Sequence, residues 1–307
     1  MARRKKGNPV HGWLVLDKPL GATSTQALGA VKRLYEAQKA GHAGTLDPLA
    51  TGILPIAFGE ATKTVSFAVD GEKAYRFSVR WGEETATDDA EGEVTERSDV
   101  RPTEGEILSV LPSFIGEISQ RPPAFSAIKI DGNRAYDLAR DGETVVLEPR
   151  FVVIDQLRLV EMPDPHTAIF EAECGKGTYV RAIARDMGRM LGCYGHVVAL
   201  RRTRVGPFSE DDAVTLDALR QAAEPAEGGD LGQYLLPVEA ALSDVPELAV
   251  SPSDAANLAQ GRSVLIRGRD APVMSGAIFA TCKGRLVALG EIEKGALHPT
   301  RVFNHGG

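Results

Sequence analysis

The segment 73–82, with the sequence KAYRFSVRWG, alternates between large apolar and polar side chains. Successive side chains of a β-strand point to opposite faces, so this spacing predicts a strand with one apolar and one polar face. The apolar face would carry Tyr75, Phe77, Val79 and Trp81, and the polar face Arg76, Ser78 and Arg80.

Further strands and helices are predicted on both sides of this segment. Thr23 and Gln26 form a capping-box pattern at the start of a helix. Apolar residues at helical spacing predict helices at 104–111 and 179–191. Short apolar runs predict strands at 12–17, 151–159, 168–174 and 196–204.

Three segments are predicted to be irregular. Residues 41–59 contain four glycines and two prolines, so we expect a loop with short helical turns or a close backbone approach to another group. The acidic stretch 85–93 is predicted to be an exposed loop or strand edge. Residues 121–150, with a turn signal at 131–132 and a short helix predicted at 134–140, are interpreted as an arm outside the core.

The chain has 307 residues, more than the usual 100 to 200 of a single domain. We expect a domain of residues 1–245 and a small β-rich module of residues 246–307. Apolar stretches are too short for a membrane span or a signal peptide. The three cysteines are scattered, so we expect a reduced, cytoplasmic protein.

The charge is unevenly distributed along the chain. The net charge is −7, yet residues 174–206 hold seven basic residues and one acid, 7 − 1 = +6. The first 18 residues also carry an excess of positive charge. Such blocks either bind nucleic-acid phosphates or are ordinary solvated surfaces, and charge alone leaves both alternatives open.

Several common sites are not indicated by the sequence. The GKGT at 175–178 lacks the spacing of a nucleotide-triphosphate loop, and no GxGxxG, GxSxG or CxxC pattern occurs. The six histidines are dispersed. We therefore expect neither a cofactor nor a metal.

Four candidate residues each have an ordinary structural interpretation. Asp47 precedes Pro48, as helix-capping aspartates do, but it also lies among glycines that would let a bulky ligand approach. His42 and Tyr75 could belong to the core. Arg181 could be a solvated charge or the partner of a buried carboxylate.

Taken together, several motifs resemble the TruB-type tRNA pseudouridine synthases. GHAGTLDPLATGILP resembles the catalytic loop of that family, and its form is nearer the bacterial stand-alone type than the guide-RNA-dependent relatives. The resemblance continues in order from about residue 10 to 210. The remaining motifs are DKPLGATS, KAYRFSVRWGEETATDDAEG, RPPAFSAIKIDGNRAYDLARDGE, GKGTYVRAIARDMG and HVVALRRTRVGPF.

The resemblance implies an α+β fold with a mixed, largely antiparallel sheet, followed by a C-terminal PUA-like RNA-binding module. It also implies an isomerase that converts uridine 55 in the T-loop of tRNA to pseudouridine without a cofactor. The motifs assign roles to individual residues. Asp47 would be the catalyst and Arg181 its charge partner, Tyr75 would stack on the uracil, Tyr179 and Leu200 would contact it, His42 would replace the flipped base, and Lys18 and Pro19 would support the loop.

The chemistry suits these residue types. One carboxylate can act first as nucleophile or base and later accept the proton from C5, and a nearby arginine lowers its pKa against desolvation. Stacking on Tyr75 would offset part of the cost of flipping the base. Gly44 and Gly52 are expected to lie against the RNA backbone, and the basic block 174–206 is expected to hold phosphates.

Two alternatives remain open at this point. One is a tRNA-folding chaperone that does not depend on catalysis, and the other is a synthase of the same chemistry acting on another RNA. The arm at 121–150 resembles the family's insertion that closes over the RNA. We expect tRNA as partner through its T-arm, no protein partner, no membrane contact and a monomer.

Overall fold

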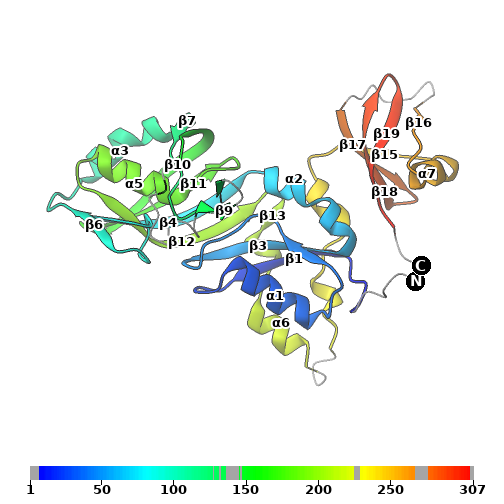
Figure 1. Cartoon of the computed structure of the whole chain (residues 1–307), viewed down its shortest axis with the longest axis horizontal. Helices are drawn as coiled ribbons and strands as arrows, with labels where there is room; N and C mark the ends of the chain where they lie inside the picture. The colour runs from blue at the N-terminus through cyan, green and yellow to red at the C-terminus, as the bar shows by residue number, and fades with distance from the viewer. Residues whose placement is uncertain are drawn as a thin grey trace.

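The computed structural model describes residues 7–126, 128–130, 133–135, 145, 147–224, 229–266 and 276–304. A large sheet runs through the first three quarters of the chain, in the order β14-β1-β3-β12-β4-β11-β10-β7 (Figure 1). β2 pairs with β3 and β13 with β12 beside this path.

The pairing of this sheet is mixed and largely antiparallel. Only β1 with β14 and β3 with β12 are parallel among its described pairs. With the helices below, this confirms the predicted α+β class. Its strands are β1 (Gly12–Lys18), β2 (Ala40–His42), β3 (Ala50–Phe58), β4 (Lys73–Trp81), β7 (Gly116–Gln120), β10 (Arg150–Asp164), β11 (Thr167–Cys174), β12 (Gly195–Val205), β13 (Phe208–Ser209) and β14 (Ala213–Thr215).

The β4 segment forms as the alternation predicts. Phe77, Val79 and Trp81 are buried, and Arg76 and Arg80 are exposed. The apolar face packs in one core with α5, whose Ile183 and Met187 are fully buried. Burial of such side chains contributes roughly 1.5 to 3 kcal/mol each, so this layer is a major source of stability.

The helices cover different parts of the sheet. Thr23 caps α1 with the predicted box to Gln26. Figure 1 shows α5 and α3 at the β4–β10 part and α1 and α6 beside β1. The helices are α1 (Ser24–Leu34), α2 (Val65–Asp70), α3 (Glu104–Val110), α5 (Val180–Met190), α6 (Leu216–Ala222) and α7 (Pro252–Ala259), with 3₁₀ turns η1 (Gly59–Lys63), η2 (Leu111–Phe114), η3 (Glu210–Asp212), η5 (Gly232–Tyr234) and η6 (Val238–Leu242).

The segment 41–59 is more regular than its glycines and prolines indicate. β3 runs unbroken from Ala50 to Phe58 through Gly52 and Pro55, so the prediction of irregular structure holds only for 43–49. Pro55 is tolerated because β12 pairs with β3 only as far as Gly52. Burial of the strand outweighs its low intrinsic propensity, because almost all of its side chains lie in the core.

A second, smaller sheet follows near the C-terminus, in the order β15-β17-β18-β19-β16. It has its own apolar cluster with α7, which confirms the predicted β-rich module (Figure 1). Phe303 also enters a core of the large sheet, and Lys63 of η1 donates to the Val302 carbonyl at 2.7 Å. Its strands are β15 (Glu247–Ala249), β16 (Val264–Leu265), β17 (Gly276–Cys282), β18 (Arg285–Glu293) and β19 (Ala296–Val302).

The expected arm lies partly outside the described residues, which in this region are 121–126, 128–130, 133–135, 145 and 147–150. Within it, β8 (Lys129–Ile130) and β9 (Asn133–Arg134) pair as a short hairpin. The short helix predicted at 134–140 lies outside the described residues beyond Ala135. The strand predicted at 151–159 is longer than expected, because β10 continues to Asp164 before it turns into β11.

Candidate active site

The loop 43–49 between β2 and β3 carries Asp47 and is fastened to the N-terminal motif 17–24. Ser24 Oγ donates to the Leu46 carbonyl at 3.0 Å and accepts from the Leu46 amide at 2.8 Å. The Gly21 amide donates to the Pro48 carbonyl at 2.8 Å. The residues before and after Asp47 are therefore both held, and its carboxylate is presented on a fixed backbone.

Lys18 is fully buried beneath this loop. Its Nζ donates to the carbonyls of Ala22 at 2.6 Å, Pro19 at 3.0 Å and Pro48 at 3.5 Å. Burial lowers the pKa of Lys18 to about 8, and the negative charge of Asp47 opposes that shift. The geometry agrees with the supporting role that the motif implies for Lys18 and Pro19.

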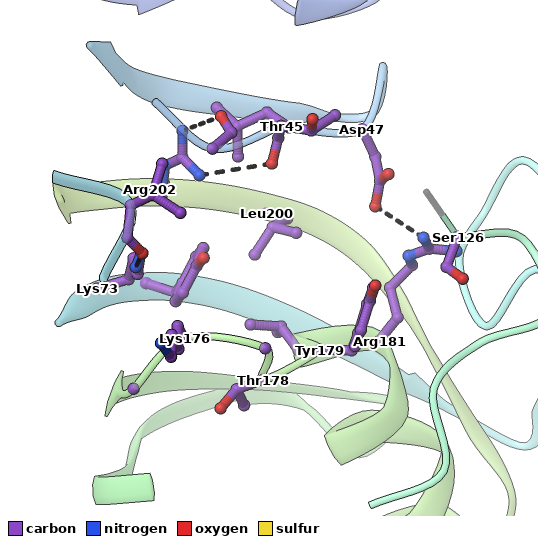
Figure 2. Close-up of a pocket in the computed structure, with 17 residues that line it drawn as sticks. Thr45, Asp47, Lys73, Ser126, Lys176, Thr178, Tyr179, Arg181, Leu200 and Arg202 are labelled. Atoms are coloured by element: carbon purple, nitrogen blue, oxygen red, sulfur yellow. Dashed lines mark hydrogen bonds and ion pairs between the residues drawn. The ribbon is translucent and has the colours of Figure 1, made fainter. Parts of the chain in front are cut away.

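Arg181, in the first turn of α5, joins three segments at the site. Its guanidinium lies 2.9 Å from the Asp47 carboxylate and 3.5 Å from that of Asp89 (Figure 2). It also donates to the carbonyls of Thr87 at 2.6 Å and Phe125 at 2.8 Å. The ion pair with Asp47 is the one that the sequence analysis expects, whereas the second carboxylate was not foreseen.

Asp47 has an unusual electrostatic environment. Burial raises the pKa of its carboxyl above the ordinary value, and the positive charges of Arg181 and Lys18 oppose this. Its side chain nevertheless keeps 38% of its surface exposed, toward the open side of the site. The ion pair thus favours the charged form of a carboxylate whose burial favours the protonated form.

A cavity of about 250 Å³ lies beside the Asp47–Arg181 pair (Figure 2). Five of the predicted residues, from four separate parts of the chain, line it. They are Asp47, Tyr75, Tyr179, Arg181 and Leu200.

Strand register fixes the positions of Tyr75 and Leu200 in the cavity wall, and two hydrogen bonds with the Gln120 side-chain amide fix the backbone of Tyr179. In the β4–β12 ladder, Tyr75 is opposite Arg202 and Leu200 is opposite Phe77. Burial raises the pKa of Tyr75, so its hydroxyl stays protonated at neutral pH. The Tyr179 amide donates to Gln120 Oε1 at 2.8 Å, and Gln120 Nε2 donates to the Tyr179 carbonyl at 3.2 Å.

His42 does not belong to this group. It ends β2, opposite Ile56 of β3, and does not line the cavity. Burial lowers the pKa of His42, and the charge of Arg202 adds to the effect, so the imidazole is neutral at pH 7. Its buried Nδ1 has no hydrogen-bond partner within the described structure.

Three residues at the site were missed. Asp89 lies in a segment predicted to be exposed, Arg202 was counted only as a charge, and Lys73 was included only as the first residue of a predicted strand. A signal for the last two does exist, because Lys73 is two residues before Tyr75 and Arg202 two residues after Leu200. Each cation therefore lies on the same strand face as a cavity residue.

The acidic stretch 85–93 is not an exposed loop throughout. Thr85, Asp88 and Asp89 are at most 6% exposed. Asp88 Oδ2 lies 2.8 Å from a guanidinium nitrogen of Arg185, so an ion pair joins this loop to α5. The prediction is wrong for these three residues, because the arginines of α5 neutralise the two carboxylates and draw this part of the loop into the structure. It holds for the exposed residues of the same stretch, which are Ala86, Ala90, Glu91 and Glu93.

The basic block 174–206, which is expected to hold phosphates, makes contacts within the protein. Each of its seven basic residues contacts an acceptor of the protein itself. Lys176 pairs with Asp70, Arg181 with Asp47, Arg185 with Asp88, Arg189 with Glu84, Arg201 with Asp17, Arg204 with Glu173, and Arg202 binds backbone carbonyls.

Gly44 and Gly52, expected to lie against RNA, approach Arg202 of the protein instead. A Cβ on Gly52 would lie 2.2 Å from the Arg202 carbonyl oxygen, and one on Gly44 would lie 3.3 Å from its guanidinium. Both glycines have positive φ angles, +94° and +89°. The close backbone approach that the glycines predict is thus internal.

Two further observations bear on other kinds of site. Within the described ranges, no three His, Cys, Asp or Glu side chains are grouped as metal ligands. No helix in those same ranges is long and apolar enough to cross a bilayer.

Sequence comparison gives the family of the chain. Residues 32–180 match the TruB family pseudouridylate synthase N-terminal domain, and residues 181–243 match the tRNA pseudouridylate synthase B C-terminal domain. Two relatives are named tRNA pseudouridine synthase B. The one from Bradyrhizobium diazoefficiens is 60% identical over 99% of this chain and 90% of its own length, and the one from Agrobacterium fabrum is 56% identical over 98% and 97%.

Solved structures share the fold over nearly the whole chain. One in a Cbf5-Nop10-Gar1 complex matches with a TM-score of 0.74 and 27% identity, over 95% of this chain and 84% of its own. Another, in an archaeal box H/ACA sRNP Nop10-Cbf5 complex, matches with a TM-score of 0.71 and 26% identity, over 99% and 91%.

The sheet, the aspartate loop and these matches define a pseudouridine synthase, an isomerase that exchanges the nitrogen link of uracil for a carbon link. Within that class, the chain belongs to the TruB family. The resemblance read from the motifs is confirmed.

Proposed function

We propose that this protein converts uridine 55 in the T-loop of tRNA to pseudouridine. The observation that carries the proposal is the cavity that joins Asp47, held by Arg181, to Tyr75, Tyr179 and Leu200. Its volume of about 250 Å³ is below the range of drug-sized ligand sites and suits one flipped nucleoside. The tRNA assignment is supported by the names of the closely similar relatives.

In this mechanism, Asp47 is the catalyst and Arg181 keeps it ionised. Tyr75 and Leu200 enclose the uracil ring between an aromatic and an aliphatic wall, and Tyr179 contacts it from the start of α5. The base turns in place after the bond from N1 to C1′ breaks, then C5 bonds to C1′ and its proton passes to Asp47. Because uracil returns to the same sugar, the reaction consumes no oxidant, water or cofactor.

His42 has a separate role in this proposal. A neutral imidazole next to the catalytic loop can enter the stack that the target base leaves. Its position outside the cavity suits this, because a residue that replaces the base need not touch the flipped uracil.

The remaining features of the proposal concern the whole chain. Residues 1–245 form the catalytic domain, with an arm at 121–150 that closes over the RNA, and residues 246–307 form a PUA-like RNA-binding module. The protein acts as a monomer in the cytoplasm and needs no protein partner. A tRNA-folding chaperone role, or action on another RNA, is the alternative.

The decisive experiment uses a T-arm RNA that carries tritium at C5 of its uridines. The full-length protein should release one equivalent of tritium per RNA, and Asp47→Asn should release none while its RNA affinity changes less than tenfold. Mapping the modified nucleotide tests position 55. Release from the Asn variant would contradict the role of Asp47, and tight tRNA binding without release by the wild type would favour the chaperone or another RNA.

A further inference from the structure

Three buried cations surround the site without a carboxylate partner. Lys18, Lys73 and Arg202 are 0%, 7% and 2% exposed, and within the described part of the chain none of them forms an ion pair. The other two buried basic side chains, Arg181 and Arg185, both bind carboxylates. Burying an unpaired charge is costly, so this arrangement is not one that packing alone would favour.

Lys73 and Arg202 line the cavity itself, whereas Lys18 lies behind the loop. Lys73 Nζ donates to the carbonyls of Val69 and Gly71. Arg202 Nε donates to the Ile53 carbonyl at 2.8 Å, and a terminal nitrogen donates to that of Gly44 at 3.1 Å. Backbone carbonyls hold both groups in place, but a carbonyl oxygen is not a full negative charge and neither group has an ion-pair partner among the described residues.

The two cations occupy one end of the cavity. Figure 2 shows Lys73 and Arg202 on one side of Leu200, and Asp47 with Arg181 on the other. Burial lowers the pKa of Lys73, and the nearby positive charge of Arg202 adds to this shift. Burial also lowers the pKa of Arg202, whereas the Tyr75 hydroxyl and the negative charge of Asp47 oppose that shift.

The proposed reaction generates a negative charge in this place. When the bond between N1 and C1′ breaks, both electrons stay on the base, and uracil leaves as an anion with charge on N1, O2 and O4. The sugar carbon either bonds to the Asp47 carboxylate or loses a neighbouring proton to it. When C5 then bonds to C1′, the carboxylate is released or returns that proton, and the C5 proton finally moves to N1 through Asp47.

We propose that Lys73 and Arg202 form an electropositive wall that stabilises the detached uracil anion. This inference rests on the proposed function and adds two residues to it. Fixed charges in a water-poor cavity stabilise developing charge well, because they need no reorganisation during the reaction. The two cations would also keep the uracil anion in the cavity while the base rotates, because they stabilise its negative charge there.

The test varies two things, the charge of residues 73 and 202 and the acidity of the base that leaves. Lys73→Gln and Arg202→Gln keep an amide donor for the carbonyls but remove the charge, and Lys73→Arg and Arg202→Lys keep the charge. Each folded variant receives T-arm RNA with uridine or 5-fluorouridine at the target. Fluorine makes the base more acidic, so its anion needs less stabilisation. Single-turnover loss of the N1-linked target nucleoside measures detachment for both RNAs.

We expect each Gln variant to detach uracil roughly 100-fold more slowly, the usual effect of removing one such stabilising group. The fold decrease in detachment rate should be at least tenfold smaller for the 5-fluorouridine RNA than for the uridine RNA. The variants that keep the charge should recover part of the wild-type detachment rate. Arg201→Gln is the matched control, because this neighbouring arginine pairs with Asp17 and Glu210 and does not line the cavity. It should leave both rates within threefold.

Equal slowing of the two RNAs, or charge-keeping variants as slow as the Gln variants, would assign both cations a purely structural role and overturn the proposal. If one Gln variant does not fold, the other decides, since the two lie on different strands. Asp47→Asn is measured alongside. Activity in that variant would overturn the catalytic role of Asp47. The role of Lys73 and Arg202 would still be tested by the ratio of the detachment rates for the uridine and 5-fluorouridine RNAs.

Discussion

Gly52 faces the backbone of Arg202 so closely that a Cβ at residue 52 would lie 2.2 Å from the Arg202 carbonyl oxygen. The contact joins β3 to β12 at the point where the parallel pairing of these strands ends. It also brings the loop that carries Asp47 and the cavity wall to a fixed separation, because Asp47 precedes one strand and Leu200 lies on the other.

Gly52→Ala should therefore lower the free energy of unfolding by about 2 kcal/mol or more, through a backbone clash and a strained positive φ angle. Urea denaturation measures the change. Gly41→Ala is the control, because a Cβ there would meet nothing within 4 Å, and it should cost less than about 0.5 kcal/mol. Equal effects at the two positions would show that the contact with Arg202 is not what requires glycine.

Arg181→Met should reduce turnover more than 100-fold while RNA affinity changes less than tenfold. The variant leaves Asp47 and Asp89 without their shared cation, so the pKa of the Asp47 carboxyl would rise further and its ionised form would be disfavoured. Single-turnover kinetics and filter binding measure the two quantities. Arg189→Met, two turns along the same helix and paired with Glu84, should change turnover less than threefold. Equal losses of turnover and affinity for Arg181→Met would instead make Arg181 an RNA contact.

The pKa of Lys18, lowered by burial to about 8, predicts opposite effects of alkaline pH on activity and stability. The unfolded chain binds more protons than the folded one between pH 8 and the ordinary lysine pKa of 10.5, so the contribution of Lys18 to the free energy of unfolding should rise with pH there. Turnover should fall above pH 8, because the ammonium that holds Pro48 is lost.

Lys18→Arg provides the test of this assignment, since a guanidinium stays charged throughout this range. The alkaline fall in turnover should disappear in that variant, even if its maximum rate is lower. An unchanged pH profile would show that another group causes the fall. The pH dependence of urea unfolding, compared between wild type and variant, measures the contribution to stability.

The salt dependence of RNA binding should come from residues other than the block 174–206. Arg201→Gln and Arg204→Gln should each change the slope of log affinity against log salt by less than 0.5, because both arginines already bind carboxylates. Removal of residues 3–6, which contribute four positive charges, should reduce the slope by about 2 to 3. A large effect of Arg204→Gln alone would mean that its ion pair opens for phosphate.

The fold was largely predictable for elements whose own residue pattern indicates a helix or a strand. The alternation of β4 and the stripe of α5 identified both elements within a residue or two, because burial acts on one face of each. β3 was not predictable in this way, because its glycine and proline are acceptable only once β12 and β1 are beside it. Tertiary contacts therefore stabilise β3 as a strand although its local composition does not favour one.

The residues of the candidate site also fall into a group that the sequence identifies and a group that it does not. Asp47 and Arg181 were identified through family motifs, and their 2.9 Å contact agrees with the expected pairing. Asp89, Lys73 and Arg202 could not be recognised by counting charges, because a charge count treats every arginine or acid as solvated. The spacing of Lys73 and Arg202 from Tyr75 and Leu200 places them on the face of the cavity residues, whereas the burial of Asp89 becomes evident only in the folded loop.

The first strand of the protein also has a consequence for its synthesis. β1 pairs in parallel with β14, and the Trp13 amide and carbonyl both bind Leu236. A ribosome must therefore translate the whole segment from β1 to β14 before β1 finds its outer neighbour. During that interval, one edge of the sheet is open to other nascent chains, which makes this an interval when chaperones would be of use.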